Sequence, residues 1–527
     1  MDPNIRKEDF PLFKYYEFDV GALCQLASKM RREIACSCDL NQRPKRGGFN
    51  WTVFILFEDG LQWVLRSPVV QNSPELSNES VSKLLASEAA TLKYLKAYTD
   101  ITVPDVYSYC AYRNNPLRIP YILMSKAEGK TLETMWGGSD LHNRLDSLEI
   151  NKVMSQLGQV TWKLAQVRFA QIGPLSEEDG FFVIGECLSK GHIQHKRHSL
   201  KGIHRGPFIS ENEFYRSLIA TLIKHANMLP LAHHCFAAPV PSRNDYPNKD
   251  QWDGARDLWN EFLTIGQKAD GATNRVDYII ASHALNRLIS QYASNWSEIA
   301  SSPSFPLCHP DLTTNNIFVD DQYSITCIID WAFATTVPIP LLLSPPGFPQ
   351  SRHKLDERFC LSFRDGFQVA AALNAANPPV GLSVPKALRC VTNSQFAWCL
   401  TRFLVFDSTD DLSLFRTMWE SIYPSAPKLE SYFFSQRGLK FYLTLHKRIR
   451  LEDLSETQIQ QSENDLFTEP LVRHLTMISG WGFNYDPSRL SGLRDTEQIL
   501  ITDRWLWRWL MEFRKQQCER FGIEDTL

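Results

Sequence analysis

The stretch 307–331, LCHPDLTTNNIFVDDQYSITCIIDW, constrains the fold of this chain more than any other. Two runs rich in Ile and Val, residues 317–319 and 325–329, are separated by the turn-forming residues 320–324. Apolar runs interrupted by a cluster of turn residues are typical of a β-hairpin. A polar loop, residues 309–316, comes directly before the first of these runs. The stretch therefore predicts a polar loop that leads into a hairpin.

The predicted hairpin would bring three side chains with oxygen atoms together. Asp330 closes the second strand, and the turn folds it back towards Asp311 and Asn316 in the polar loop. Mg²⁺ is a hard cation that takes carboxylate and amide oxygens and keeps phosphate oxygens and waters as its other ligands. Phosphoryl transfer needs such a metal, and also a carboxylate that orients the attacking hydroxyl and accepts its proton. The grouping indicates this chemistry, and a chance arrangement of polar loop residues is the alternative.

The spacing of these residues matches a known catalytic pattern. Kinase-like enzymes have His-x-Asp, an Asn five residues after that Asp, and a second Asp at the end of the next hairpin. His309, Asp311 and Asn316 fit the first part, and Asp330 follows Asp311 by 19 residues. Protein kinases carry Lys two residues after the catalytic Asp, where this chain has Thr313, and Asp-Phe-Gly where it has Asp-Trp-Ala. These differences argue against a protein Ser/Thr kinase.

The motifs His-Pro-Asp-Leu at 309–312 and Ile-Asp-Trp at 329–331 instead resemble those of the aminoglycoside phosphotransferase and choline kinase group. They look most similar to fungal members of the phosphotransferase enzyme family, over about residues 43–340. The resemblance implies an α/β, protein-kinase-like bilobal fold, with a small antiparallel sheet lobe and an enlarged, mostly helical lobe. It also implies the site roles. Asp311 would be the catalytic base, with His309 supporting its loop by hydrogen bonding, and Asn316 and Asp330 would hold Mg²⁺ or Mn²⁺.

A second group of residues, nearer the N-terminus, is predicted to cover the nucleotide. Two strand-like runs, 50–57 and 61–66, are separated by Glu-Asp-Gly, which is a hairpin signal. Glycines ahead of such a ribbon let backbone N–H groups approach phosphate oxygens, although a plain loop is the alternative. The predicted phosphate-covering loop consists of Gly47, Gly48, Phe49 and Asn50.

Arg66 and Glu88 fit the cation and its partner in a kinase fold. Such folds place a cation on the third strand to hold the nucleotide phosphates, and pair it with a Glu on a helix. Arg66 ends the second run, and Glu88 lies in a strongly helical segment. Most kinases have Lys here, but Arg is permanently charged and can bind phosphate bidentately, with a different geometry. Two solvated surface residues are the alternative. At the hinge between the lobes, the resemblance implies that Ser125 and Ala127 hold the adenine.

Composition excludes several classes of protein. A hydrophobic content of 43% in 527 residues predicts a globular chain of more than one domain-sized unit. The net charge of −3 gives no indication of a nucleic-acid-binding face. No apolar run reaches the ~18 residues of a membrane span, and the N-terminal segment lacks the apolar region of a signal peptide. The 12 scattered cysteines are expected to be reduced thiols, so we expect a cytoplasmic protein.

The chain is expected to contain four consecutive parts. They are a leader helix region (1–40), the small lobe (41–126), a large lobe with the catalytic loop and an insertion (127–350), and a C-terminal helical extension (351–527). Inside the large lobe lies a basic, His-rich segment, residues 190–205. It is expected to be solvated and mobile, with binding of an anion or a metal as the alternatives.

From the resemblance we expect a Mg²⁺-dependent small-molecule kinase. It would transfer the terminal phosphate of ATP or GTP to a hydroxyl of a metabolite, an amino-alcohol or an aminoglycoside-like acceptor. Its partners would be the nucleotide and the acceptor, without nucleic acid or membrane. The alternative is a weak or inactive pseudokinase that acts as a binding or scaffold protein. Arg66 and the short glycine loop favour that alternative, whereas the intact Asp311, Asn316 and Asp330 argue against it.

Overall fold

The computed structural model divides the chain into two compact units that alternate along the sequence. The first contains Met1–Gly138, Leu145–Phe214 and Trp296–Ser394, and the second contains Ser139–Arg144, Tyr215–Asn295 and Gln395–Leu527. The four predicted parts are not tested by this division and stay a prediction. The structure describes residues 18–39, 49–68, 76–135, 147–229, 272–296, 299, 304–348, 356–374, 382–405, 411–425 and 427–452, and the backbone alone of 45–46, 235–239 and 498–501.

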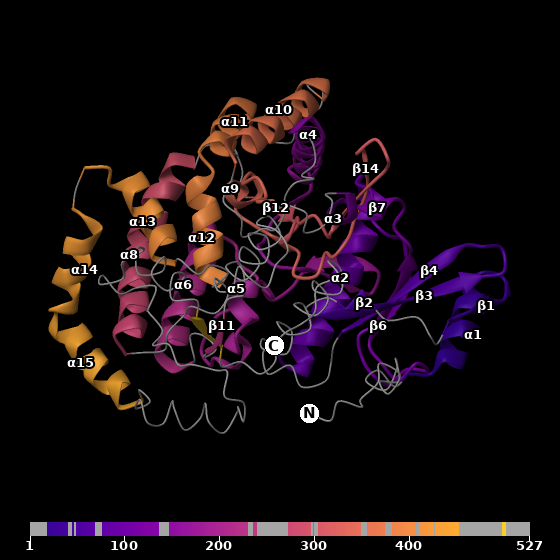
Figure 1. Cartoon of the computed structure of the whole chain (residues 1–527), viewed down its shortest axis with the longest axis horizontal. Helices are drawn as coiled ribbons and strands as arrows, with labels where there is room; N and C mark the ends of the chain where they lie inside the picture. Colours follow the sequence, from indigo (N-terminus) through magenta and orange to yellow (C-terminus); the bar gives the residue numbers. More distant parts are fainter. Residues whose placement is uncertain are drawn as a thin grey trace. The chain divides into compact units, whose positions relative to one another are not determined.

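The N-terminal part of the first unit contains an antiparallel sheet of six strands (Figure 1). Strands β1, β3, β4, β6 and β5 follow one another in that order, and β2 pairs with β3. The predicted hairpin is confirmed, because β3 and β4 pair across a turn in which Gly60 has a φ of 83°. Alternate residues of β3 face the core, as expected for a sheet that is buried on one side. The strands are β1 (Cys36–Ser37), β2 (Lys45–Arg46), β3 (Asn50–Phe57), β4 (Gln62–Pro68), β5 (Val106–Cys110) and β6 (Tyr121–Ser125).

Two helices accompany this sheet. The predicted leader helix is present as α1 (Val20–Met30), whose Leu23 and Ala27 are buried in the cluster that includes Trp51 of β3. Helix α2 (Asn78–Tyr98) packs on β5 and β6. Its N-cap is Ser77, whose hydroxyl accepts a hydrogen bond from the Ser80 N–H at 3.1 Å. The helix carries Glu88 into the interior of the unit.

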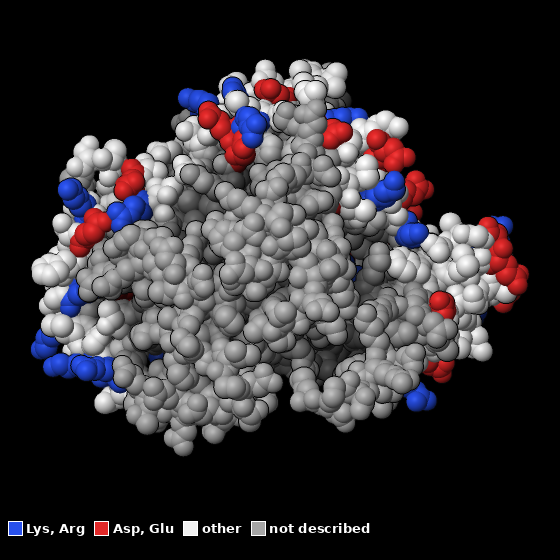
Figure 2. Space-filling model, in the orientation of Figure 1, with Lys and Arg blue, Asp and Glu red and all other residues white. Residues whose placement is uncertain are grey.

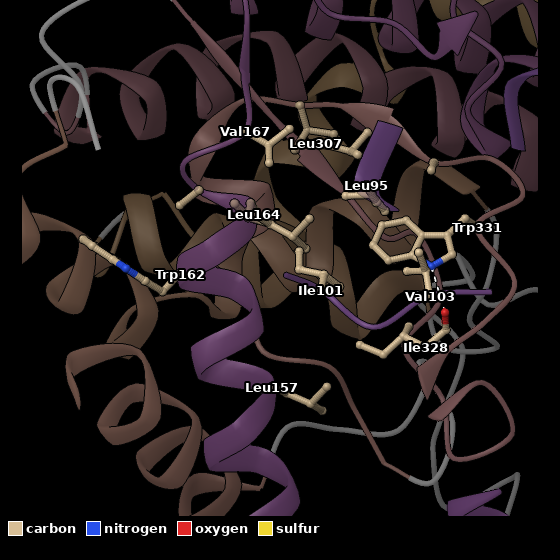
Figure 3. Packing of buried hydrophobic residues seen from close by; sticks show 14 of the residues in the cluster. Leu95, Ile101, Val103, Leu157, Trp162, Leu164, Val167, Leu307, Ile328 and Trp331 are labelled. Atoms are coloured by element: carbon tan, nitrogen blue, oxygen red, sulfur yellow. Dashed lines mark hydrogen bonds between the residues drawn. The ribbon is translucent and has the colours of Figure 1, made fainter. Parts of the chain in front are cut away.

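The hairpin predicted at 317–329 is also confirmed. Strand β13 (Ile317–Val319) pairs with β14 (Ile325–Ile328) on one side and with β7 (Lys130–Thr131) on the other. Trp331 follows β14 and is buried in an apolar cluster that includes Leu95 of α2 (Figure 3). Its indole N–H donates to the Ile328 carbonyl at 3.0 Å. The end of the hairpin is therefore anchored in the core.

Helix α4 (Ser147–Leu164) packs closely on α10 (Glu357–Leu373) within the first unit. Glycines permit this approach. A Cβ atom added at Gly158 would lie 2.0 Å from the Phe363 carbonyl oxygen, and one added at Gly366 would lie 1.8 Å from the Ser155 carbonyl oxygen. Further elements of this unit are α3 (Leu132–Met135), β8 (Arg168–Phe169), β12 (Phe305–Cys308), β15 (Thr335–Thr336), α9 (Ile339–Leu342) and α11 (Val384–Thr392).

Strands β9 (Leu175–Glu178) and β10 (Phe181–Ile184) form a hairpin. The basic segment that follows was predicted to be solvated, and this prediction is wrong. It forms α5 (Lys190–Ile193) and the 3₁₀ helix η2 (Arg197–Ser199). His192 and Arg197 are fully buried, and one guanidinium nitrogen of Arg197 donates to the Gly191 carbonyl at 2.8 Å. Buried cations and histidines need such partners, so the segment is part of the packed structure.

The second unit is mostly helical. Helix α6 (Glu211–Met228) is capped by Ser210, whose hydroxyl accepts a hydrogen bond from the Glu213 N–H at 3.2 Å. Strands β11 (Cys235–Pro239) and β16 (Gln498–Ile501) pair with each other. Inside the unit, Arg437 pairs with the fully buried Asp277. The other elements are α8 (Ala272–Trp296), α12 (Gln395–Val405), α13 (Asp411–Ile422), α14 (Leu429–Arg437), α15 (Lys440–Ile449) and the 3₁₀ helix η4 (Arg450–Glu452).

The predicted fold class, α/β with an antiparallel sheet and many helices, is confirmed. None of the helices described here combines the length and the apolar character that a membrane crossing requires. On the described part of the face shown in Figure 2, acidic and basic side chains are interspersed. The ten cysteines whose side chains are described are free thiols.

Candidate active site

Arg66 of β4 joins residues from distant parts of the sequence. Its side chain is 8% exposed, and its guanidinium lies between two carboxylates. One terminal nitrogen donates to Glu88 on α2, and the other donates to Asp330 after β14. When the Asn50 amide is oriented to satisfy both of its polar atoms, its oxygen accepts from Arg66 Nε at 3.2 Å and from Nη2 at 2.6 Å. The structure thus gathers three other predicted site residues, Glu88, Asp330 and Asn50, around the Arg66 cation.

The two carboxylates that contact Arg66 have pKa values shifted in opposite directions. Burial raises the pKa of Glu88, and the charge of Arg66 opposes that shift. Burial also acts to raise the pKa of Asp330, but the charge and hydrogen bond of Arg66 hold it below its usual value. Two carboxylates therefore share one guanidinium, which leaves an excess of negative charge beside the partly exposed Asp330. Such a site favours the approach of a further cation.

Asp330 lies in a sharp turn. Its φ is 63°, in the left-handed region that Asp tolerates better than most residues. Phe333 has a φ of 64°, and the Ala334 N–H donates to the Trp331 carbonyl at 3.0 Å. Because the buried Trp331 anchors the chain next to it, the turn holds the Asp330 carboxylate at the end of the hairpin. Strained conformations of this kind persist where the surrounding packing enforces them.

His309 organises the loop that carries Asp311. Its Nδ1 accepts from the Asp311 N–H at 3.0 Å, and its Nε2 donates to the Ile329 carbonyl at 3.0 Å. These two contacts define the tautomer, and burial lowers the pKa of the ring. The Asn316 amide nitrogen donates to the Asp311 carbonyl at 2.9 Å. Hydrogen bonds therefore hold both the N–H and the carbonyl of Asp311, and both ring nitrogens of His309 are already hydrogen-bonded.

The residues expected to bind a metal lie at one end of the hairpin. Ile317 pairs with Ile328, and the Ile329 N–H donates to the Asn316 carbonyl at 2.9 Å, so Asn316 and Asp330 stand at neighbouring strand ends. Among the described side chains, no three His, Cys, Asp or Glu residues gather as a metal site. One amide and one carboxylate are hard ligands, and they fit Mg²⁺, which takes few protein ligands and completes its shell with phosphates and waters.

The predicted phosphate-covering loop is described only in part. Gly47 and Gly48 lie outside the described residues. The Phe49 ring meets the edge of the Phe333 ring at a centroid distance of 5.2 Å, and Asn50 contacts Arg66 as described above. The described end of this loop therefore contacts the turn that follows Asp330.

The two predicted hinge residues differ in their environment. Ser125 ends β6, and both its N–H and its hydroxyl are bonded to the backbone of Asp105, each at 2.9 Å. No hydrogen bond joins the Ala127 peptide group to another residue in the part of the chain that is described. Adenine binding at the hinge stays a prediction.

Two contacts of the loop 309–316 were not predicted from the sequence. Lys190 Nζ lies 3.5 Å from Asp311 Oδ2. Thr314 donates its hydroxyl hydrogen to the Glu133 carboxylate, and the Glu133 N–H donates to the Thr314 carbonyl at 2.9 Å. The basic character of the segment after β10 marked Lys190 as a possible ligand for an anion. No spacing rule, however, connects that segment with Asp311.

Two solved structures align with most of this chain at low identity and low TM-score. One is the macrolide 2'-phosphotransferase MphH of Brachybacterium faecium, with 16% identity, a TM-score of 0.32 and coverage of 77% of this chain and 99% of that one. The other is a putative fructosamine-3-kinase of Thermobifida fusca, with 12% identity, a TM-score of 0.34 and coverage of 82% and 100%.

Similar sequences come from fungi. A subtelomeric hrmA-associated cluster protein of Aspergillus fumigatus is 25% identical over 323 residues, which cover 57% of this chain and 59% of that protein. The altered inheritance of mitochondria protein 9 of Lachancea thermotolerans is 35% identical over 118 residues, which cover 21% and 18%. The match thus spans about three fifths of the length of the Aspergillus relative and less than a fifth of the Lachancea one.

A family model covers the region that carries the site. It describes the phosphotransferase enzyme family and matches residues 42–339, more than half of the 527 residues. The matched region begins ahead of β3 and includes Arg66, Glu88, the catalytic loop and the turn at Asp330. The resemblance noted in the sequence is confirmed, and the chain belongs to the phosphotransferase enzyme family.

Proposed function

We propose that this phosphotransferase is a Mg²⁺-dependent kinase that transfers the terminal phosphate of ATP or GTP to a hydroxyl of a small molecule. The observation that carries the proposal is the position of the Arg66 guanidinium, shared between Glu88 and Asp330. Kinase-like enzymes use this arrangement to hold nucleotide phosphates beside a metal-binding carboxylate. A scaffold protein would have no chemical need for the complete set.

Asp311 is the base in this proposal. Its carboxylate is 31% exposed, so an acceptor can reach it, while its backbone is held by His309 and Asn316. It orients the acceptor hydroxyl and takes its proton as the oxygen attacks the terminal phosphorus. His309 supports the loop and does not transfer a proton, because both of its ring nitrogens already make hydrogen bonds.

Arg66 supplies the positive charge that attracts the phosphates, and Glu88 and Asn50 hold its guanidinium in place. Asn316 and Asp330 hold the metal. When bound, Mg²⁺ or Mn²⁺ would neutralise negative charge on the phosphates and on the departing nucleoside diphosphate. Phe49 and the glycines before it cover the phosphates, and Ser125 and Ala127 lie beside the adenine.

The acceptor class is proposed from chemistry and from similar proteins. A carboxylate base suits a hydroxyl acceptor, and the similar structures include a macrolide phosphotransferase and an ethanolamine kinase. We propose a metabolite, an amino-alcohol or an aminoglycoside-like compound as the acceptor, and neither nucleic acid nor a membrane as a partner. The cytoplasmic location stays a prediction. A relative carries the word mitochondrial in its name, and imaging of the tagged protein would decide between the two locations.

Thermal melting with nucleotides tests the proposal. At about a hundred times Kd, MgATP or MgGTP should stabilise the protein by roughly 2.7 kcal/mol. Asp311→Asn should keep this shift and abolish turnover with any acceptor found by screening small hydroxyl compounds. Asp330→Asn should lose both, because it removes a metal ligand. Asp321→Asn, an equal charge change on the exposed turn of the same hairpin, should lose neither.

The possible outcomes separate the two functions. A melt that neither nucleotide moves, with Mg²⁺ or Mn²⁺ present, contradicts the kinase. A nucleotide shift without turnover on any acceptor favours the pseudokinase. If Asp311→Asn and Asp330→Asn behaved alike in the melt, the assignment of base and metal ligand would be wrong.

A further inference from the structure

Lys190 brings a second cation to the catalytic loop. It is the first residue of α5, and its Nζ lies 3.5 Å from Asp311 Oδ2 and 5.9 Å from the centre of the Phe333 ring. Its side chain is 24% exposed. The ammonium group therefore lies between the Asp311 carboxylate and the ring of Phe333, which is part of the turn after Asp330.

The backbone that carries Lys190 is firmly held. The Ser189 hydroxyl and Nδ1 of the buried His192 are 2.8 Å apart, and the His192 N–H donates to the Ser189 carbonyl at 2.8 Å. On either side of Lys190, Leu188 and Ile193 pack in one cluster with Phe333. The base of the side chain is thus attached to the turn after Asp330. The four-carbon stem remains free to move its charge over a short distance.

The ion pair with Asp311 stabilises the fold too little to explain why Lys190 lies at this position. Both side chains are a quarter to a third exposed, and the closest approach of 3.5 Å is long for a strong ion pair. Pairs of this kind contribute little to the stability of a fold. Among the described residues, Lys190 is the ion-pair partner of Asp311. The placement is therefore better explained by the reaction.

The reaction needs a cation at this point. A carboxylate base and a terminal phosphate are both negative, and they must come within one hydroxyl group of each other. Protein kinases have Lys two residues after the base, whereas Thr313 occupies that position here and carries no charge. Its N–H donates to the Asp311 carbonyl at 3.0 Å, so Thr313 has a structural part in the loop.

We propose that Lys190 is a catalytic residue that contacts the transferred phosphoryl group. The proposal rests on the kinase function proposed above. The acceptor oxygen forms a bond to the terminal phosphorus, while the bond from that phosphorus to the bridging oxygen breaks. The electron pair of the broken bond leaves on the nucleoside diphosphate, and the hydroxyl proton goes to Asp311. Lys190 keeps its proton throughout, and its charge moves from Asp311 to the non-bridging oxygens of the phosphoryl group.

Comparing nucleotides that differ in the terminal phosphate tests this role without a known acceptor. The probes are MgADP and the Mg²⁺ complex of a non-hydrolysable ATP analogue, or the guanine pair if the wild type prefers it. Lys190→Met should weaken binding of the triphosphate about tenfold to a hundredfold, the range of a hydrogen bond to a charged group. Binding of the diphosphate should change by less than about threefold, because the diphosphate lacks the contacted group.

Three further variants complete the experiment. Lys190→Gln, a second neutral substitution, should repeat the result and guards against a folding defect of the Met variant. Lys190→Arg keeps a cation and should recover most of the triphosphate affinity. Lys83→Met removes an exposed lysine of α2 that pairs with Glu79, and should leave both affinities unchanged.

The outcomes distinguish this inference from the proposed function. If the wild type binds neither nucleotide, the kinase function fails and the role of Lys190 fails with it. If the wild type binds both, and the neutral variants lose both affinities equally or lose neither, the role of Lys190 alone is refuted. A selective loss for the triphosphate, with recovery in Lys190→Arg, supports the proposal.

Discussion

Arg66→Met should destabilise the protein even before any nucleotide is added. The Glu88 side chain is 4% exposed, and Arg66 is its ion-pair partner. Removing one partner of a buried pair costs about 3–5 kcal/mol, because the other charge is left buried and uncompensated. The Asp330 side chain is 39% exposed, so solvent compensates it and it adds little to the loss. For a folding unit of this size, the melting temperature should fall by roughly 5–8 °C.

A second substitution separates stability from binding. Arg66→Met combined with Glu88→Gln removes the uncompensated buried charge, so the melting temperature should return most of the way to that of the wild type. Nucleotide affinity should stay low, because the positive charge of Arg66 is still absent. Effects on a contacting pair are not additive, and the double-mutant cycle measures this coupling.

The pH dependence follows from the direction of the Glu88 shift. Burial raises the pKa of Glu88, and loss of Arg66, which opposes the shift, should raise it further. In the Arg66→Met variant, the folded protein keeps the Glu88 proton that the unfolded chain releases near pH ~4.3. The stability of the variant therefore falls as the pH rises from that value towards the raised pKa of Glu88. The melting temperature of Arg66→Met should therefore be closer to that of the wild type at about pH 5 than at about pH 8.

The control is Arg31→Met, which breaks the more exposed pair with Asp59 in the same unit and should hardly move the melting temperature. Melting curves of the wild type and of the single and double variants, with nucleotide Kd values at one salt concentration, provide the measurement. An Arg66→Met protein that melts like the wild type, or a double variant no more stable than Arg66→Met, would refute this reasoning.

Two further predictions concern packing and a buried charge. Gly158→Ala should cost about 1–3 kcal/mol despite the higher helix propensity of Ala, because its Cβ would lie 2.0 Å from the Phe363 carbonyl oxygen. Gly438→Ala, whose nearest atom would be 3.5 Å away, is the control, and a higher melting temperature for Gly158→Ala contradicts the clash. Burial raises the pKa of Asp277 to about 6, against the effect of Arg437. Arg437→Met should therefore destabilise the protein more at about pH 8, by about 3–5 kcal/mol, than at about pH 5, and equal melting shifts at both would count against it.

Local patterns in the sequence identified most of the elements that frame the site. Both hairpins, at 50–66 and 317–329, were predicted from alternating or β-rich runs on either side of turn residues, and both are present. The start of α6 is set by the Ser210 hydroxyl, which accepts a hydrogen bond from the Glu213 N–H at 3.2 Å. These features are encoded within a few residues of one another, so a single sequence is enough to indicate them.

Other features depend on contacts that no local pattern records. Arg66 and Asp330 are separated by 264 residues, and Lys190 and Asp311 by 121. The basic segment was predicted to be solvated because its composition is polar, but the fold buries His192 among aromatic rings. Burial of a charged or polar residue is decided by the surfaces that pack around it, not by its neighbours in sequence.

The sequence by itself determined which chemical groups are present and how they are ordered. His309, Asp311 and Asn316 occupy one loop, and Asp330 closes the hairpin that follows, because hydrogen bonding within a hairpin links residues close in sequence. Only the tertiary structure decided which cations meet these carboxylates. Side chains from different elements come together when apolar surfaces pack, and that packing placed Arg66 on Asp330 and Lys190 on Asp311.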